Sequence, residues 1–205
     1  MPYALSDGTR IFWEESGSGE PLLLIMGLGY SHEMWHRTRP VVSAHYRTIL
    51  FDNRGVGKSD VPQGAYSIAQ MAADAAAVLD TAGITKAHVF GMPMGGMIAQ
   101  EFALNYPERV NRLVLGCTAC GGRNAIPAAQ NVLDVVMARA KMTPEAGAEA
   151  MVPYIYDRST PVNGSKKIWR SGDAPIQKRQ ATWAKCKRYL HGLHSTGLGV
   201  LVCPR

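Results

Sequence analysis

Residues 91–95 read Gly-Met-Pro-Met-Gly. The two outer glycines match G-x-S-x-G, a pattern that holds a nucleophilic serine on a sharp turn between a strand and a helix. Pro93 stands at the serine position, and proline has no hydroxyl group that could attack a carbonyl carbon. Proline also fixes φ near about −65°, whereas the nucleophile of such a turn is held at positive φ. We therefore expect no intact catalytic residue here and a turn that relaxes into an ordinary helix start.

Two backbone N–H groups near this turn could still stabilise a negatively charged oxygen. The first belongs to Met94, directly after the proline, although a relaxed turn would re-aim it. The second belongs to Leu28, in a loop at 26–29 whose glycines let a ligand approach the backbone closely. An ordinary glycine turn is the alternative interpretation of that loop. The small residues Gly91, Gly95 and Gly96 would allow the strand and the helix to pack closely.

The segment Asp52–Ser59 ends in Gly-Lys-Ser, as a phosphate-binding loop does. That pattern, G-x-x-x-x-G-K-[ST], requires a glycine at the position of Asp52. We therefore predict no nucleotide cofactor, and a structural turn held by Asp52 and Arg54.

The spelling His-Glu-Met-Trp-His at 32–36 matches H-E-x-x-H, in which two histidines on one helical face bind zinc. Pro40 leaves room for barely two helical turns, and no third ligand with a known spacing follows. We predict no metal, with His32 and His36 at the rim of a cleft or on the surface. Cys117 and Cys120 have the redox C-x-x-C spacing but follow a strand rather than open a helix. We expect them to pack beside the cleft.

The elements that would position these residues alternate between strands and helices. Uninterrupted apolar runs are typical of strands that are buried on both faces of a parallel sheet. Apolar residues at helical spacing predict the intervening helices, and a doubly wound α/β sheet follows from the alternation. The predicted strands are 10–16, 21–26, 47–52, 87–91 and 110–116, and the predicted helices are 67–83, 94–105, 126–141 and 144–154.

Charge separates the last quarter of the chain from the rest. Residues 162–205 carry nine Lys and Arg against the single acid Asp173, whereas residues 1–161 carry thirteen against fifteen acids. Without a binding motif, this basic segment predicts a solvated tail and no nucleic-acid or membrane partner. No secretory signal or long apolar run is visible, which predicts a cytoplasmic protein with free cysteine thiols.

The loop at 26–29, the D-x-R-G-x-G-x-S segment and the turn at 91–96 together resemble the α/β-hydrolases. Residues 97–122 are similar to bacterial esterases and lactonases of the oxoadipate enol-lactonase type. The resemblance covers roughly residues 3–160. It implies an α/β-hydrolase core at 1–122 and the start of a helical cap at 123–160. It also implies a small-molecule ester or lactone as the ligand, and a serine assisted by a histidine and an acid.

This chain departs from that pattern after the cap. The family's acid and histidine follow later strands, where residues 161–205 form an aperiodic basic tail. Asp173, His191 and His194 lie there, but none has a matching context, so we assign no part of a triad. A change of reading frame near Pro161 would explain both the charge shift and the lost resemblance. The strand at 110–116 would then expose a sheet edge.

We therefore expect a fold that is incomplete at its C-terminal end and a hydrolase that is catalytically impaired. The alternatives are a non-catalytic binding protein that uses the old cleft, and a truncated fragment without function.

Overall fold

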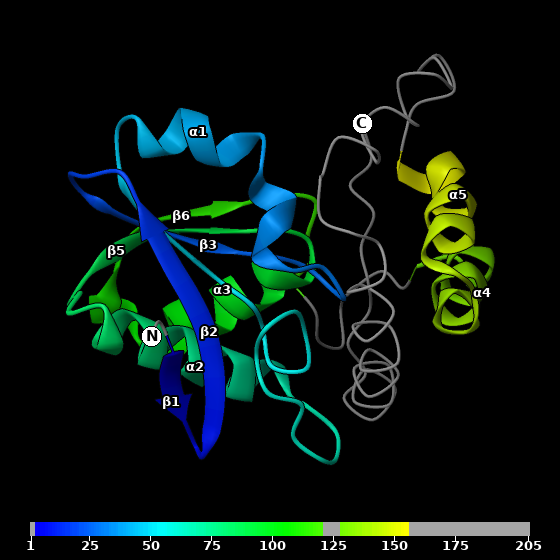
Figure 1. Cartoon of the computed structure of the whole chain (residues 1–205), viewed down its shortest axis with the longest axis horizontal. Helices are drawn as coiled ribbons and strands as arrows, with labels where there is room; N and C mark the ends of the chain where they lie inside the picture. The colour runs from blue at the N-terminus through cyan, green and yellow to red at the C-terminus, as the bar shows by residue number, and fades with distance from the viewer. Residues whose placement is uncertain (1–2, 121–127, 156–205) are drawn as a thin grey trace.

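The computed structural model describes residues 3–120 and 128–155 of the 205-residue chain. Its centre is a six-stranded sheet in the order β1-β2-β4-β3-β5-β6 (Figure 1). Neighbouring strands from β4 to β6 run parallel, while β1 and β2 form an antiparallel extension at one side. The strands are β1 Tyr3–Ser6, β2 Thr9–Ser16, β3 Pro21–Ile25, β4 Arg47–Phe51, β5 Ala87–Gly91 and β6 Val110–Leu115.

The predicted mostly parallel α/β sheet is confirmed, and the apolar runs explain its centre. Four consecutive residues of β3 and four of β4 are buried, as expected for strands covered on both faces. The sequence reasoning missed β1, because its four residues show too short a pattern. It pairs with β2 through a turn at Asp7 and Gly8, which both have positive φ, as the tightest hairpin turns require.

Helices cover both faces of the sheet (Figure 1). The helices α2 Ile68–Thr81 and α3 Met94–Asn105 lie on one face, and η1 His32–Trp35 and α1 Thr38–Ser43 lie on the other. A capping box between Ser67 and Gln70 fixes the start of α2. Its end is a Schellman motif, in which Gly83 (φ 68°) and Ile84 donate their N–H groups back to the last turn. Both boundaries agree with the sequence prediction.

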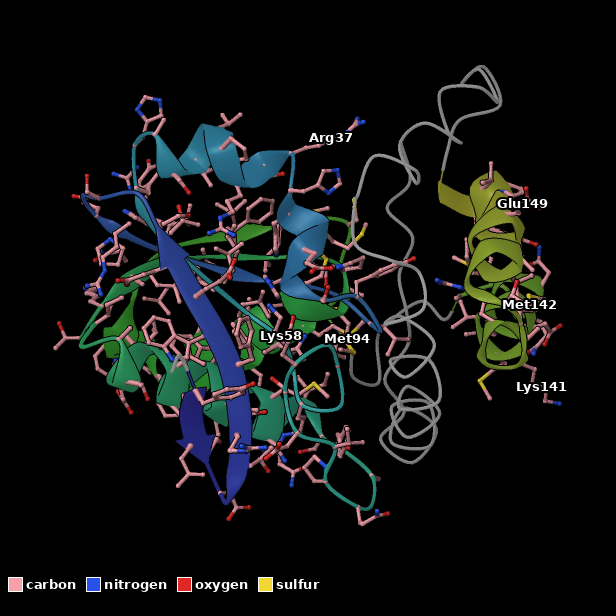
Figure 2. The ribbon with its side chains drawn as sticks, in the orientation of Figure 1. Arg37, Lys58, Met94, Lys141, Met142 and Glu149 are labelled. Carbon is pink, nitrogen blue, oxygen red and sulfur yellow. The ribbon has the colours of Figure 1, made fainter. Side chains whose placement is uncertain are left out.

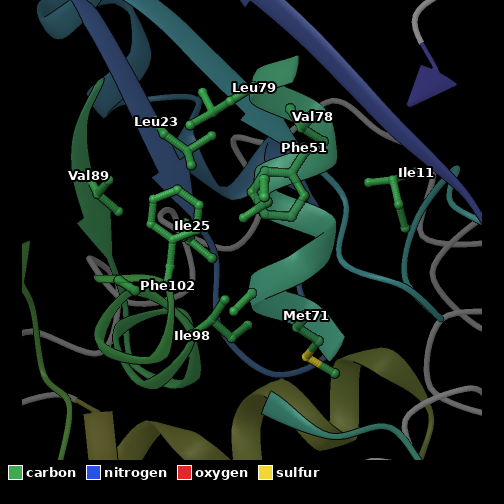
Figure 3. Packing of buried hydrophobic residues seen from close by; sticks show 14 of the residues in the cluster. Ile11, Leu23, Ile25, Phe51, Met71, Val78, Leu79, Val89, Ile98 and Phe102 are labelled. Atoms are coloured by element: carbon green, nitrogen blue, oxygen red, sulfur yellow. The ribbon is translucent and has the colours of Figure 1, made fainter. Parts of the chain in front are cut away.

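The main hydrophobic core lies between the sheet and the helices α2 and α3. Figure 3 shows side chains from the sheet, including Leu23, Ile25 and Phe51, packed against Val78 of α2 and Phe102 of α3. A smaller cluster on the opposite face includes Leu24, Leu50 and Trp35. These two clusters fix the carboxyl ends of β3, β4 and β5, where the loops of the candidate site begin.

Two features lie beyond the well-packed core. A helical segment follows the undescribed residues 121–127, with α4 Gln130–Ala138, η3 Arg139–Lys141 and α5 Pro144–Ile155 and no strand between them, as predicted. The strand β6 ends the described sheet, and five of its six residues are exposed, which confirms the exposed edge. Residues 156–205, with Asp173, His191 and His194, lie outside the described residues.

Candidate active site

The turn between β5 and α3 carries Pro93 at the position expected for a nucleophile. Pro93 has φ −62° and ψ −52°, so it lies in the right-handed helical region rather than at positive φ. The N–H groups of Gly95 and Gly96 donate to the carbonyl oxygens of Met92 and Pro93, at 3.0 and 3.1 Å. The hydroxyl of Thr118 donates to the same Pro93 oxygen at 2.5 Å. The turn is therefore an ordinary helix start, as the fixed φ of proline predicts.

The glycines of this turn are required by close contacts with the neighbouring backbone. A Cβ atom on Gly95 would lie 2.0 Å from the carbonyl oxygen of Ile25, and one on Gly91 would lie 2.2 Å from the oxygen of Gly95. A Cβ atom on Gly96 would meet the side chain of Thr118 at 2.5 Å. The strand-to-helix crossing is thus as tight as an elbow requires, although its central residue is not a nucleophile.

The loop after β3 lies directly against Pro93. A Cβ atom on Gly27 would fall 2.5 Å from Cδ of the proline ring. Leu28 is half-buried against the main core, and its N–H makes no hydrogen bond within the described part of the chain. Met94, the first residue of α3, is buried, and the first N–H groups of a helix have no partner inside it. The two proposed oxyanion donors thus belong to two segments that touch.

The loop after β4 is organised by the carboxyl group of Asp52, which is fully buried. Its Oδ1 accepts the backbone N–H of His32 at 2.7 Å and lies 2.7 Å from the Nδ1 atom of the same residue. Its Oδ2 accepts the N–H of Lys58 at 2.8 Å, and Gly57 leaves no room for a Cβ atom beside it. Figure 2 marks Lys58 on this loop and Met94 at the start of α3. The prediction of a structural turn held by Asp52 is confirmed.

Two further residues of this loop tie it to the rest of the molecule. Asn53 donates from Nδ2 to the carbonyl oxygen of Met26 at 2.8 Å, and so joins the loop to the segment that carries Leu28. Arg54 forms a buried ion pair with Asp74 of α2, with N–O distances of 2.6 and 2.7 Å. Both contacts hold the loop at 52–59 in place, and neither exposes a reactive group.

The structure corrects the prediction for His32. This residue is only 5% exposed, because its ring packs between the buried Asp52 and Glu14 of β2, whose Oε1 lies 3.6 Å from Nε2. Glu14 also pairs with Arg39 of α1. The Nδ1 atom of His36 lies 3.2 Å from the carbonyl oxygen of Glu33. A sequence signal for the buried role of His32 exists in principle, since an aspartate after a buried strand must find hydrogen-bond donors.

The segment after β6 also differs from expectation. Cys117 and Cys120 are free and exposed, so the prediction that they pack beside the cleft is wrong. Between them, Thr118 contacts Gly96 and Pro93, and Ala119 is buried. The small residues that pack here are therefore Thr118 and Ala119, which lie between the two cysteines.

A contact between Arg139 and Tyr30 joins the helical segment 130–155 to the core and was not predicted. Arg139 donates from Nη2 to the hydroxyl of Tyr30 at 2.9 Å, and its guanidinium lies 5.5 Å from the centre of that ring. Tyr30 directly follows the loop at 26–29, and so η3 contacts the chain segment that also packs against Pro93. Sequence reasoning had no signal for a pair separated by 109 positions.

The described surroundings of Pro93 come from residues 3–120 and 128–155. No histidine in these ranges forms a hydrogen bond with residues 91–96. The same ranges contain no group of three His, Cys, Asp or Glu side chains that could hold a metal ion. None of the helices that the structure describes is both long and apolar enough to cross a membrane.

Comparisons with known proteins show that this chain is similar to hydrolases. A putative carbamate hydrolase RutD from Azorhizobium caulinodans is 41% identical over 115 residues, which are 56% of this chain and 43% of that protein. A 2-hydroxy-6-oxononadienedioate/2-hydroxy-6-oxononatrienedioate hydrolase from Burkholderia vietnamiensis is 43% identical over 126 residues, which are 58% and 44% of the two chains. The chain thus spans less than half the length of these curated relatives.

Solved structures show the same likeness. An enol-lactonase from Burkholderia xenovorans LB400 superposes with a TM-score of 0.75 and 26% identity, over 96% of this chain and 75% of the other. An esterase from Rhodococcus sp. ECU1013 gives a TM-score of 0.76 at 26% identity, over 97% and 74% of the chains. Residues 20–147 match the family model of the alpha/beta hydrolase fold. With the parallel sheet and the tight crossing at 91–96, this match shows that the chain belongs to the α/β-hydrolase family.

Proposed function

We propose that this chain is an α/β-hydrolase family member that does not hydrolyse esters or lactones through a serine nucleophile. The observation that carries the proposal is the conformation of Pro93, which has no hydroxyl group and starts α3 with helical φ and ψ. A hydroxyl nucleophile also needs an adjacent base, and no described histidine forms a hydrogen bond with the turn. Loss of the nucleophile in a serine hydrolase lowers kcat by on the order of a millionfold.

Binding of a small-molecule ester or lactone is the second candidate function. It is supported by the retained contact between the loop at 26–29 and Pro93. It is also supported by the N–H of Leu28, which has no hydrogen-bond partner among the described residues and could donate to a ligand carbonyl. The similarity to an enol-lactonase and an esterase supports the same ligand class. On this proposal the chain would bind a carbonyl compound between the loop at 26–29 and Pro93 and release it unchanged.

Hydrolysis of p-nitrophenyl acetate by the full chain and by Pro93→Ser tests the loss of catalysis. We expect both proteins to remain at the rate of the buffer, because restoring a hydroxyl does not supply a base to deprotonate it. Pro93→Ala is the matched control, since it removes the ring without adding a hydroxyl. Turnover well above that control in Pro93→Ser would reveal a functional base and contradict the proposal for the site. Turnover in the unmodified chain would contradict it directly.

A thermal melt with and without a small lactone tests the binding function separately. A ligand that binds only the folded state raises the midpoint as its concentration increases. An unchanged midpoint at saturating lactone would exclude this class of ligand, while aggregation without a cooperative transition would favour a non-functional fragment.

A further inference from the structure

The strand β6 combines the sequence of an interior strand with the exposure of a surface strand. Its residues 113–115 are Leu-Val-Leu, yet their exposed fractions are 37%, 51% and 43%. By contrast, the neighbouring strand β5 buries three of its five residues. Consecutive apolar residues are typical of a strand that is covered on both faces and paired at both edges. Something besides the described residues is therefore expected to cover β6.

Register shows that apolar side chains point to both faces of the sheet here. Leu113 pairs with Val89, which belongs to the core beside α3, so Leu113 shares that face. Val114 pairs with Phe90, which packs with the cluster on the opposite face beside η1. Since paired residues in a sheet point to the same side, the apolar surface continues around the edge of β6.

Among the described strands, β6 has no neighbour on the edge that faces away from β5. Every second residue of a strand directs its N–H and C=O toward the same neighbour. The bond from the N–H of Gly116 to the carbonyl oxygen of Gly91 places Gly116, and therefore Val114, on the side of β5. Leu113 and Leu115 consequently direct their backbone groups away from the described sheet, which is the arrangement that accepts another strand.

We propose that β6 is a self-association surface, on which two copies of this chain pair their β6 strands antiparallel about a two-fold axis at Val114. In this register Leu113 of one copy faces Leu115 of the other, and the two Val114 side chains meet at the axis. The outward backbone groups of Leu113 and Leu115 then bond each other, as a hydrogen-bonded antiparallel pair requires.

The charges of β6 favour a second copy as the occupant. The only charged residue of the strand is Arg112, which would face Gly116 of the partner strand, so no like charges are opposed. Apolar residues face apolar residues, which makes the strand complementary to itself, as a two-fold interface demands. Proline, which often blocks free edges, is absent from β6, and so is an inward-pointing lysine.

The test is the mass of the full chain in solution over about a hundredfold range of concentration, because assembly follows mass action. We expect the unmodified protein to approach twice the monomer mass at the upper end. Val114→Lys and Val114→Glu should each remain at the monomer mass, since like charges directly opposite each other disfavour pairing. An equal mixture of the two variants should recover the doubled mass.

Leu104→Lys is the matched control, because Leu104 is an apolar residue of α3 with 77% exposure and lies outside β6. It should dimerise like the unmodified chain. A circular-dichroism melt of each variant identifies any that fails to fold, and Val114→Thr then replaces it, with an expected loss of dimer at low concentration only.

Two results would overturn the proposal. The first is an unmodified chain that stays monomeric throughout the range. If its unfolding midpoint also falls strongly in Val114→Lys, another part of the same chain covers β6. The second is a Val114→Lys protein that dimerises as well as Leu104→Lys.

Discussion

Two neighbouring loops of this molecule are built in opposite ways. The loop at 52–59 is held by side chains, with the buried Asp52 at its centre and the ion pair of Arg54 and Asp74 beside it. The turn at 91–96 is held by its own backbone hydrogen bonds and by one side chain, that of Thr118, and its central residue contributes a ring instead of a reactive group. Both loops follow buried parallel strands, and both contact the segment after β3.

The difference separates residues that build the fold from residues that perform chemistry. Asp52 satisfies donors that would otherwise be buried without partners, so the fold depends on it. A nucleophile at positive φ costs free energy and contributes only to catalysis. Pro93 relieves that cost, and the surrounding framework remains intact. Substitutions in the loop at 52–59 should therefore destabilise the protein by removing hydrogen bonds and an ion pair. Substitutions in the turn at 91–96 should destabilise it only through steric clashes.

The largest expected effect is that of Asp52→Ala. The substitution removes the acceptor of the buried N–H of His32 and of the partly buried N–H of Lys58. We expect the free energy of unfolding to fall by about 3–5 kcal/mol, because unsatisfied buried donors carry their full desolvation cost. Urea denaturation measures it. A loss below about 1 kcal/mol would remove the distinction between the two loops.

Asp74→Ala should follow, with a loss of about 3 kcal/mol, since it removes both carboxylate contacts from the buried guanidinium of Arg54. The double variant Arg54→Met, Asp74→Leu should recover most of that loss, because apolar residues often replace a buried pair without cost. Glu15→Ala, which breaks the half-exposed pair with Arg47, is the control and should cost less than about 1 kcal/mol. Equal losses in Asp74→Ala and Glu15→Ala would show that burial of the pair is unimportant.

Two glycine-to-alanine substitutions test how closely strand and helix approach each other at the turn. Gly95→Ala forces a methyl group to within 2.0 Å of a backbone oxygen and should cost about 2 kcal/mol. Gly147→Ala in α5 meets no atom closer than 3.6 Å and should stabilise the protein by about 0.5–1 kcal/mol. Thermal denaturation of the two variants compares them directly. A neutral Gly95→Ala would mean that strand and helix do not cross as closely as described.

Sequence reasoning could predict the fold because its signals are local. The apolar runs of β3 and β4, the helical spacing of α2 and the glycines around Pro93 each specify their own segment. Proline likewise fixes its own φ, so the helix start at Pro93 followed from one residue.

The parts that could not be predicted depend on contacts distant in sequence. His32 is buried because Asp52 lies beneath it, and the pattern H-E-x-x-H contains no information about that partner. Arg139 and Tyr30 meet only after the helices have packed. The exposure of Cys117 and Cys120 depends on a loop conformation with positive φ at Cys117, which a non-glycine residue rarely adopts.

Covalent labelling of the full chain with a fluorophosphonate, measured as intact mass, tests the central claim most directly. This reagent reacts with serine hydroxyls that a neighbouring base activates. With Pro93 in place of the nucleophile, we predict a chain that keeps its unmodified mass after prolonged exposure to excess reagent. A stoichiometric adduct would contradict the account, because it would show an activated nucleophile elsewhere in this chain.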